Sequence, residues 1–174
     1  SSTSRGLGDV YKRQSLVVSP QDTVSILQAR LDSSQMALIM VKDIEKLVNM
    51  FCDLFDLRRV GLRLTSLNHA MCPRFHVDNV PCRLITTYQG IATEWLPHNA
   101  ADRSKLGTGN SGKPDSQSGI YQDESDIQQL SQGDVALLKG EGWVGNEGKG
   151  LIHRSPQLSD QTSRLILTID FIDD

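Results

Sequence analysis

Apolar side chains in the first third of the chain recur at every third or fourth position, which is the spacing of an amphipathic helix. The segment Ser19-Pro20-Gln21-Asp22 is typical of a helix start, and this helix is predicted to reach about Leu31. Ser34 and the two polar residues before it offer a cap for a second helix, which is predicted to end near Asp56. The apolar stripe of this second helix is interpreted as core packing and consists of Met36, Ile39, Met40, Ile44, Leu47, Val48, Phe51, Leu54 and Phe55.

Beyond Leu57 the pattern changes to alternation, which is typical of β-strands with one buried face. The run RRVGLRLTSL places Val60, Leu62 and Leu64 on one face, and similar runs follow with the sequences CRLITTY, DVALLKGE, GLIHR and RLILTIDF. Short strands that follow helices without β-α-β alternation predict an α+β fold, with helices packed on one side of antiparallel sheets. We favour a double-stranded β-helix, a cupin-like jelly roll, because the polar residues discussed below need a shared interior.

The chain has 174 residues, enough for one domain, in which we expect a helical region at 15–57 and a jelly-roll region at 58–174. Residues 98–119 are rich in Gly, Ser and Asn and are predicted to form a long loop, either a lid or a disordered insertion. Residues 1–14 show neither the helical spacing nor the strand alternation, and their string GLGDVYKRQ resembles translated sequencing-adapter read-through. This tail is therefore expected to be non-native, with a native but disordered tail as the alternative.

Composition and charge argue against nucleic-acid-binding and membrane proteins. The net charge is −3 and no basic stripe is visible, which disfavours nucleic-acid binding. No apolar run approaches the ~18 residues that span a bilayer, and no export signal is evident, so we expect a cytoplasmic protein with reduced thiols and no membrane partner. Cys52 lies in the helical apolar pattern and is expected to be a buried small hydrophobic residue.

The most informative polar motif is His76-Val77-Asp78. On extended backbone the first and third side chains point to the same face, which suits two ligands of one metal ion. A second histidine would complete a 2-His-1-carboxylate triad, the ligand set of non-haem Fe(II) oxygenases. His153 is favoured because it lies in the strand pattern GLIHR, whereas His98 starts the long loop and His69 is interpreted as incidental.

Arg164 is the candidate partner of this site. If GLIHR and RLILTIDF paired as antiparallel neighbours, in the register that opposes Leu151 to Ile166, His153 would face Arg164 about 5 Å away. A slip by one residue would turn the arginine away. A buried arginine needs an anion, and its planar fork suits a carboxylate.

The pattern His-x-Asp, a distal His and an Arg shortly after it resembles the Fe(II)/2-oxoglutarate-dependent oxygenases. The resemblance implies Fe(II) held by His76, Asp78 and His153, and 2-oxoglutarate held through its far carboxylate by Arg164. The alternative is a site without metal, in which His76 is a hydrogen-bonded core residue and Asp78 caps a turn. Arg164 would then pair with Asp170 or with a surface acid.

Several blocks in order, CPRFHVDNVPCRLITTYQGIATEWLPH, GDVALLKGEGWVGNEGKGLIHRSP and SRLILTIDF, resemble a bacterial family catalogued as domain of unknown function 1826. That resemblance covers about residues 35–172 and implies no assigned activity. Some family members lie near genes for zinc-linked GTPase metal chaperones, which implies a role in metal homeostasis.

Other side chains are weaker candidates. Arg74, Glu94, Trp95 and Trp143 could line a substrate pocket, although core or surface positions explain each of them equally simply. Arg83 and Arg154 are expected on the surface. Zinc bound by His76 with Cys72 and Cys82 is an alternative, but no C-x-x-C pair is present.

Three functions follow from these patterns. The favoured one is an Fe(II)/2-oxoglutarate-type oxygenase acting on an unidentified small molecule or protein. The second is a non-catalytic zinc-binding protein, and the third is a jelly-roll binding module without a metal.

Overall fold

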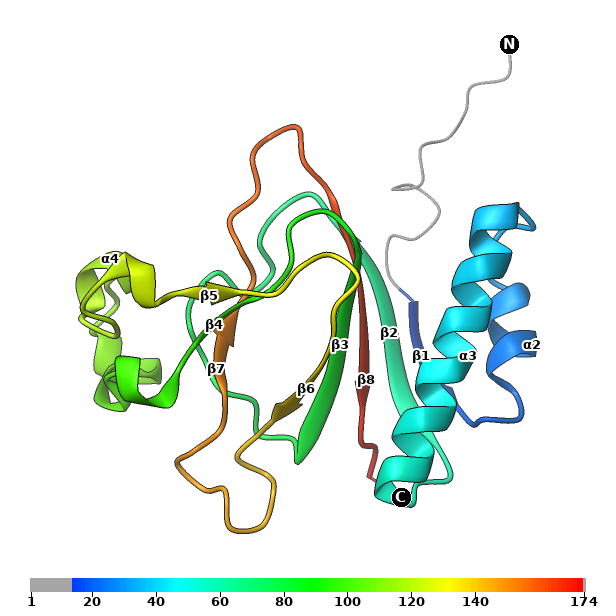
Figure 1. Ribbon diagram of the computed structural model, residues 1–174, viewed down its shortest axis with the longest axis horizontal. Helices are drawn as coiled ribbons and strands as arrows, with labels where there is room; N and C mark the ends of the chain where they lie inside the picture. The colour runs from blue at the N-terminus through cyan, green and yellow to red at the C-terminus, as the bar shows by residue number, and fades with distance from the viewer. Residues whose placement is uncertain (1–13, 174) are drawn as a thin grey trace.

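The computed structural model describes residues 14–173, which form two antiparallel sheets and three α-helices (Figure 1). The larger sheet has the strand order β1-β2-β8-β3-β6, and the smaller has the order β5-β4-β7. The strands are β1 (Gln14–Val18), β2 (Val60–Leu67), β3 (Cys82–Gln89), β4 (Glu94–Leu96), β5 (Gln128–Gln129), β6 (Val135–Lys139), β7 (Ile152–Arg154) and β8 (Arg164–Asp170). The helices are α2 (Thr23–Gln28), α3 (Gln35–Phe55) and α4 (Asp115–Ser118).

Helix α3 has the predicted bounds. The Ser34 side chain accepts a hydrogen bond from the Ala37 amide, and Asp56 ends the helix in a left-handed conformation with φ of 53°. The first predicted helix is shorter than expected, because α2 spans only Thr23–Gln28. The residues before it form a turn in which the Ser19 amide donates to the Asp22 carboxylate, and the Thr23 amide donates to the Ser19 carbonyl oxygen at 3.1 Å.

Helices α2 and α3 cover one face of the larger sheet, and the smaller sheet lies on the opposite side (Figure 1). The structure confirms antiparallel sheets with helices on one side. About half of the predicted stripe of α3 is buried in the core against the larger sheet, including Ile44, Val48 and Phe51. Three other members, Met36, Ile39 and Leu54, are exposed. The buried face of the helix instead includes Ala37, Val41 and Cys52, which were not part of the predicted stripe.

Strand β1 was not predicted, and it lies inside the expected helical region. It pairs antiparallel with β2 from Gln14, opposite Leu64, to Val18, opposite Val60. The five runs predicted as strands are confirmed as β2, β3, β6, β7 and β8, whereas the short strands β4 and β5 were also missed. Within residues 14–173 no helix has both the length and the apolar character that crossing a bilayer requires.

The predicted loop at 98–119 contains three short 3-10 turns and α4. It is anchored to the rest of the molecule by Asp115, whose buried carboxylate accepts bonds from the Phe75 amide at 2.9 Å and from Arg154 at 2.8 Å. The loop therefore has a fixed position beside the segment that carries the His-x-Asp motif.

A glycine-rich loop after β6 supports the backbone of that motif. The Glu141 amide donates to the carbonyl oxygen of Asp78 at 2.8 Å, and the Gly140 amide donates to that of Pro81 at 3.0 Å. A β-carbon at Gly140 would collide with the carbonyl oxygen of Val80, so this close approach requires glycine.

Gly140→Ala is therefore expected to lower the free energy of unfolding by about 2–4 kcal/mol. Gly145→Ala is the matched control in the same loop: its φ is 82°, but a β-carbon there meets open space, so only backbone strain of about 1–2 kcal/mol is expected. Chemical denaturation of both variants measures the difference, and equal losses would contradict this account of the contact.

Candidate metal centre

His76 and His153 lie directly opposite each other on neighbouring backbone segments. Each amide donates to the other residue's carbonyl oxygen at 3.0 Å, which forms an isolated antiparallel bridge. His153 belongs to β7, which is fixed on its other side by β4 through the pairing of Trp95 with His153. Because opposed residues of an antiparallel pair present their side chains on one face, the two imidazoles lie together, with ring centroids 4.5 Å apart.

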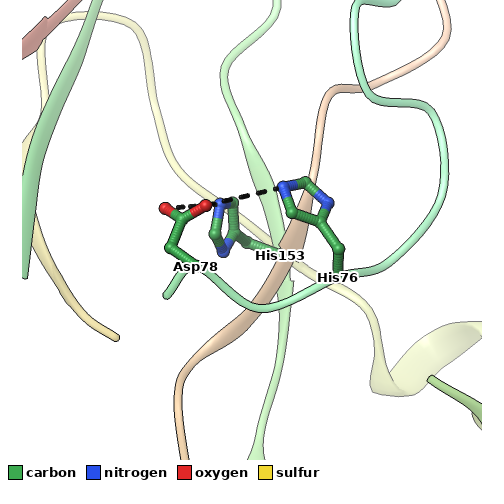
Figure 2. Close-up of side chains that lie close together, drawn as sticks. All are labelled: His76, Asp78 and His153. Atoms are coloured by element: carbon green, nitrogen blue, oxygen red, sulfur yellow. Dashed lines mark ion pairs between the residues drawn. The ribbon is translucent and has the colours of Figure 1, made fainter. Parts of the chain in front are cut away.

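Asp78 completes the cluster from the same loop as His76 (Figure 2). Its Oδ1 lies 3.9 Å from Nε2 of His76, and its Oδ2 lies 3.5 Å from Nε2 of His153. One ligand atom from each of the three residues falls within 4.8 Å of the others. This is close to the spacing of atoms that share one ion at about 2.0–2.2 Å, so the structure brings together the three residues that the sequence suggested.

The second nitrogen of each ring fixes its tautomer. Nδ1 of His76 lies 2.9 Å from the carbonyl oxygen of Arg74, and Nδ1 of His153 lies 3.1 Å from that of Leu151. A carbonyl oxygen can only accept, so each Nδ1 carries the proton. Each Nε2 then has a free lone pair, the form in which a histidine binds a metal.

The electrostatics of the cluster also suit a cation. Burial lowers the pKa of His153 and so favours the neutral ring, although the charge of Asp78 acts in the opposite direction. Oδ2 of Asp78 is buried and accepts no hydrogen bond in the part of the chain that the structure describes. Two imidazoles that turn Nε2 toward an undersatisfied carboxylate fit a divalent transition metal.

Arg83 forms an ion pair with Asp78, at the carboxylate oxygen that also approaches His153. Its Nη1 lies 3.0 Å from Oδ2 of Asp78 as an ion pair that is not aligned as a hydrogen bond. Its Nε and Nη2 bind the two carboxylate oxygens of Asp170 at 2.7 and 3.2 Å, which fixes the guanidinium in one orientation. The expectation that Arg83 lies on the surface is wrong, because these two carboxylates draw it inward.

Arg83→Met is expected to weaken metal binding by about 10–100-fold, because it frees the orientation of a ligating carboxylate. Arg63→Met is the matched control, since Arg63 reaches Asp170 at 3.7 Å, is half exposed and forms no ion pair with Asp78 within the described residues. Co(II) titration followed by visible absorption compares the two variants, and equal affinities would count against this role of Arg83.

Arg164 is buried inside the molecule, but the pairing proposed for it is wrong. β8 lies between β2 and β3 in the larger sheet, whereas β7 belongs to the smaller sheet, so His153 and Arg164 are not opposed. Because side chains alternate along β8, Arg164 shares the face of Ile166, which packs in the apolar layer with Leu138. The arginine therefore enters the interior between the sheets from the opposite wall.

A cavity of about 260 Å³ lies in this interior. Thr93 links it to the arginine, because its hydroxyl accepts a bond from Nη2 of Arg164 at 3.3 Å. His153 links it to the metal candidate site. The cavity is lined by Thr93, Trp95, Leu130, Ala136, Leu137, Leu138, Leu151 and His153.

Arg164 lacks a full set of partners. It is 1% exposed, and its Nε and Nη1 form no hydrogen bond within the described residues. Burial lowers the pKa of its guanidinium to about 10. Glu94, whose charge raises that pKa, is itself bound to Arg154 at 2.6 Å. The alternative that Arg164 pairs with Asp170 is wrong, because Asp170 binds Arg83 and Arg63.

The four side chains proposed to line a substrate pocket lie in different places. Trp95 lines the inner cavity, and Glu94 beside it is held by Arg154, which lies inside an ion-pair network rather than on the surface as expected. Arg74 is exposed and bonds the carbonyl oxygen of Gly112 at 3.2 Å. Trp143 does not line this cavity: its ring packs on Phe55 and under Lys139.

The remaining histidines and cysteines lie outside the cluster. His98 approaches Arg103, and His69 is exposed beside Asn68. Within residues 14–173 the three-residue metal candidate contains no cysteine, with Cys72 exposed and Cys52 and Cys82 buried. Arg103 was missed, because it carries no local sequence signal.

Comparison with solved structures shows what the fold resembles. The crystal structure of a dioxygenase for auxin oxidation from rice superposes with a TM-score of 0.54 and 13% identity, over 94% of this chain and 56% of that one. Dioxygenase for auxin oxidation 1 from Arabidopsis thaliana, in a binary complex with 2-oxoglutarate, gives a TM-score of 0.50 and 13% identity, over 94% of this chain and 64% of that one. The chain thus spans less than two thirds of either dioxygenase, and at this identity the likeness shows the fold alone.

No curated protein matches the chain. A family model described as "Protein of unknown function (DUF1826)" matches residues 3–170. The match includes most of the tail at 1–14, whose non-native character stays a prediction because residues 1–13 lie outside the described part. Since the match covers nearly the whole sequence, the chain belongs to the DUF1826 family.

Proposed function

We propose that this protein is an Fe(II)/2-oxoglutarate-dependent oxygenase built on a jelly roll. Two antiparallel sheets on either side of an apolar interior with a cavity support the assignment to a double-stranded β-helix. The likeness to two dioxygenases for auxin oxidation, one of them solved with 2-oxoglutarate, supports the proposal at the level of fold.

The metal would be held by Nε2 of His76, Nε2 of His153 and the carboxylate of Asp78. A 2-His-1-carboxylate set occupies one side of an octahedral ion and leaves positions for other ligands. When bound, Fe(II) supplies the activation of dioxygen and 2-oxoglutarate supplies electrons for it. The chain's own contribution is to orient the two rings through their Nδ1 bonds and the carboxylate through Arg83.

The observation that carries the proposal is the buried, partly unbonded Arg164. An arginine in an apolar interior without an acid to neutralise it is costly, unless an anion binds there. The cavity of about 260 Å³ is lined by His153, one of the proposed ligands, and by Thr93, whose hydroxyl accepts a bond from Arg164. A small dicarboxylate could thus reach the metal at one end and the guanidinium fork at the other.

Anaerobic titration of the protein with Fe(II) and then with 2-oxoglutarate tests the proposal. A metal-to-ligand charge-transfer band is expected in the visible spectrum once both are bound, and it should be lost in Asp78→Ala. Zinc retained through purification, together with no band and no 2-oxoglutarate affinity, would contradict the oxygenase proposal and favour a zinc-handling role. Absence of any metal affinity would leave a binding module.

A further inference from the structure

A second cavity lies on the outer side of the metal candidate site. This cleft has a volume of about 570 Å³ and includes His76, whose side chain is 35% exposed. Its walls are the loop of 3-10 turns at 98–110 and the glycine-rich loop that follows β6. It is lined by His76, Val77, Asn79, Arg103, Leu106, Gly107, Thr108, Glu141 and Gly148. The inner cavity reaches His153, so the metal candidate site has cavities on two sides.

Arg103 joins the two walls of the cleft. From the loop of 3-10 turns, its Nη1 donates to the carbonyl oxygen of Gly150 at 2.9 Å and its Nη2 donates to Glu141 at 3.1 Å. Nη1 also lies 3.4 Å from Nδ1 of His98. These contacts fix the guanidinium at the edge of the cleft, while Nε has no partner among the described residues. A cation held in place in this way loses little entropy when it binds a ligand.

The other polar side chains of the cleft include further donors. The Asn79 amide and the Thr108 hydroxyl form no side-chain hydrogen bond within residues 14–173 and line the same cleft as Arg103. Val77 and Leu106 supply apolar surface between them. Glu141 is the one carboxylate among the lining residues, and Arg103 already binds one of its oxygens. A ligand with acceptor oxygens at one end and an apolar body fits these groups.

We propose that this cleft binds the primary substrate, and that the substrate is a small organic carboxylate anchored by Arg103. The inference rests on the proposed function, because the cleft is a substrate site only if His76 holds the reactive metal. Arg103 would donate hydrogen bonds to the carboxylate, and the apolar walls would hold the body of the molecule beside His76. Arg164 would meanwhile serve the co-substrate in the inner cavity, so each arginine would bind a different carboxylate.

Benzoate is a suitable probe, because it combines a carboxylate with a small apolar body. Saturation-transfer NMR on the metal-free protein measures its binding without any requirement for the metal. Arg103→Met is expected to weaken this binding at least tenfold, since a charge-assisted bond is lost. Glu141→Gln is expected to strengthen it about threefold, because the bond to Arg103 is kept and the competing negative charge is removed.

Arg164→Met is the matched control, because benzoate could also enter the inner cavity. Benzoate affinity that survives Arg164→Met and falls in Arg103→Met supports the outer cleft, whereas the reverse order overturns the inference. If Arg103→Met fails to fold, Glu141→Gln decides: unchanged or weaker binding overturns the inference.

Mn(II) separates the failure of this inference from the failure of the proposed function. With Mn(II) and 2-oxoglutarate bound, the proton signals of benzoate are expected to broaden in wild type and not in Arg103→Met. Binding that depends on Arg103 without any Mn(II) affinity would overturn the oxygenase proposal but leave the carboxylate site standing. Binding that does not depend on Arg103 overturns the inference whatever the metal does.

Discussion

With His153 replaced by alanine, the protein is expected to bind Fe(II) or Co(II) more than 100-fold more weakly than wild type. His153 is one of three ligands and the most buried of them, with 5% of the residue exposed, so no water or neighbouring side chain can easily replace it. Changing a residue that merely supports a ligand already costs about 10–100-fold, and removal of a ligand should cost more. Anaerobic titration followed by calorimetry measures the affinity.

The control for His153→Ala is His69→Ala. His69 is exposed, bonds only its neighbour Asn68 within the described residues, and lies outside the metal cluster. Its replacement is expected to leave metal affinity within a factor of two. Equal metal affinities in wild type and His153→Ala would contradict the assignment of His153 as a ligand and, with it, the oxygenase proposal.

Arg164→Met is expected to stabilise the protein without ligands while it removes 2-oxoglutarate binding. Burial lowers the pKa of this guanidinium to about 10, so the folded state holds the proton less tightly than the unfolded state. The resulting penalty is fully present below pH 10 and is relieved as the pH rises from there toward the ordinary pKa of an arginine. An apolar side chain of similar volume escapes it, and a gain of about 1–3 kcal/mol is expected at pH 7.

Thermal unfolding with and without 2-oxoglutarate checks both halves of this prediction. In the presence of Fe(II) or Mn(II), 2-oxoglutarate should raise the Tm of wild type by mass action and leave that of Arg164→Met unchanged. Arg74→Met is the matched control, because Arg74 is exposed and lies outside the inner cavity. A variant that is less stable than wild type, or that still responds to 2-oxoglutarate, would contradict the role assigned to Arg164.

Together, these two predictions assign different tasks to the two walls of the interior. The smaller sheet and the loop before β3 carry the metal ligands, and β8 of the larger sheet carries the arginine. A variant of the arginine wall should therefore leave the metal ligands intact. Metal affinity is expected to survive Arg164→Met, which distinguishes loss of the co-substrate site from general unfolding.

Much of the local structure could be predicted from the chain. The apolar spacing and the Ser34 cap predicted the bounds of α3, and alternation predicted five of the strands. These signals are local, because they depend on how side chains repeat along one element. Alternation puts Arg164 and Ile166 on one face of β8, and the structure shows that this face turns away from the helices.

Signals that depend on neighbours in space were less informative. The strands β1, β4 and β5 were missed, because each is fixed by pairing with a strand that is distant in sequence: β1 pairs with β2, and β4 pairs with β5 and β7. The exposed positions of Met36 and Ile39 could not be read from helical spacing, which defines a stripe but not which part of it the sheet covers. The surface expectation for Arg83 failed for a similar reason, because its two carboxylate partners are distant in sequence.

The sequence by itself determined which residues could form the metal cluster. The spacing of His76 and Asp78 puts them on one face of extended backbone, and His153 lay in a strand pattern, which are properties of the local chain. Only the tertiary structure decided how these pieces meet. His153 pairs with His76 rather than with Arg164, because strand neighbours are chosen by packing across the whole molecule. Arg164 consequently reaches the interior from the other sheet.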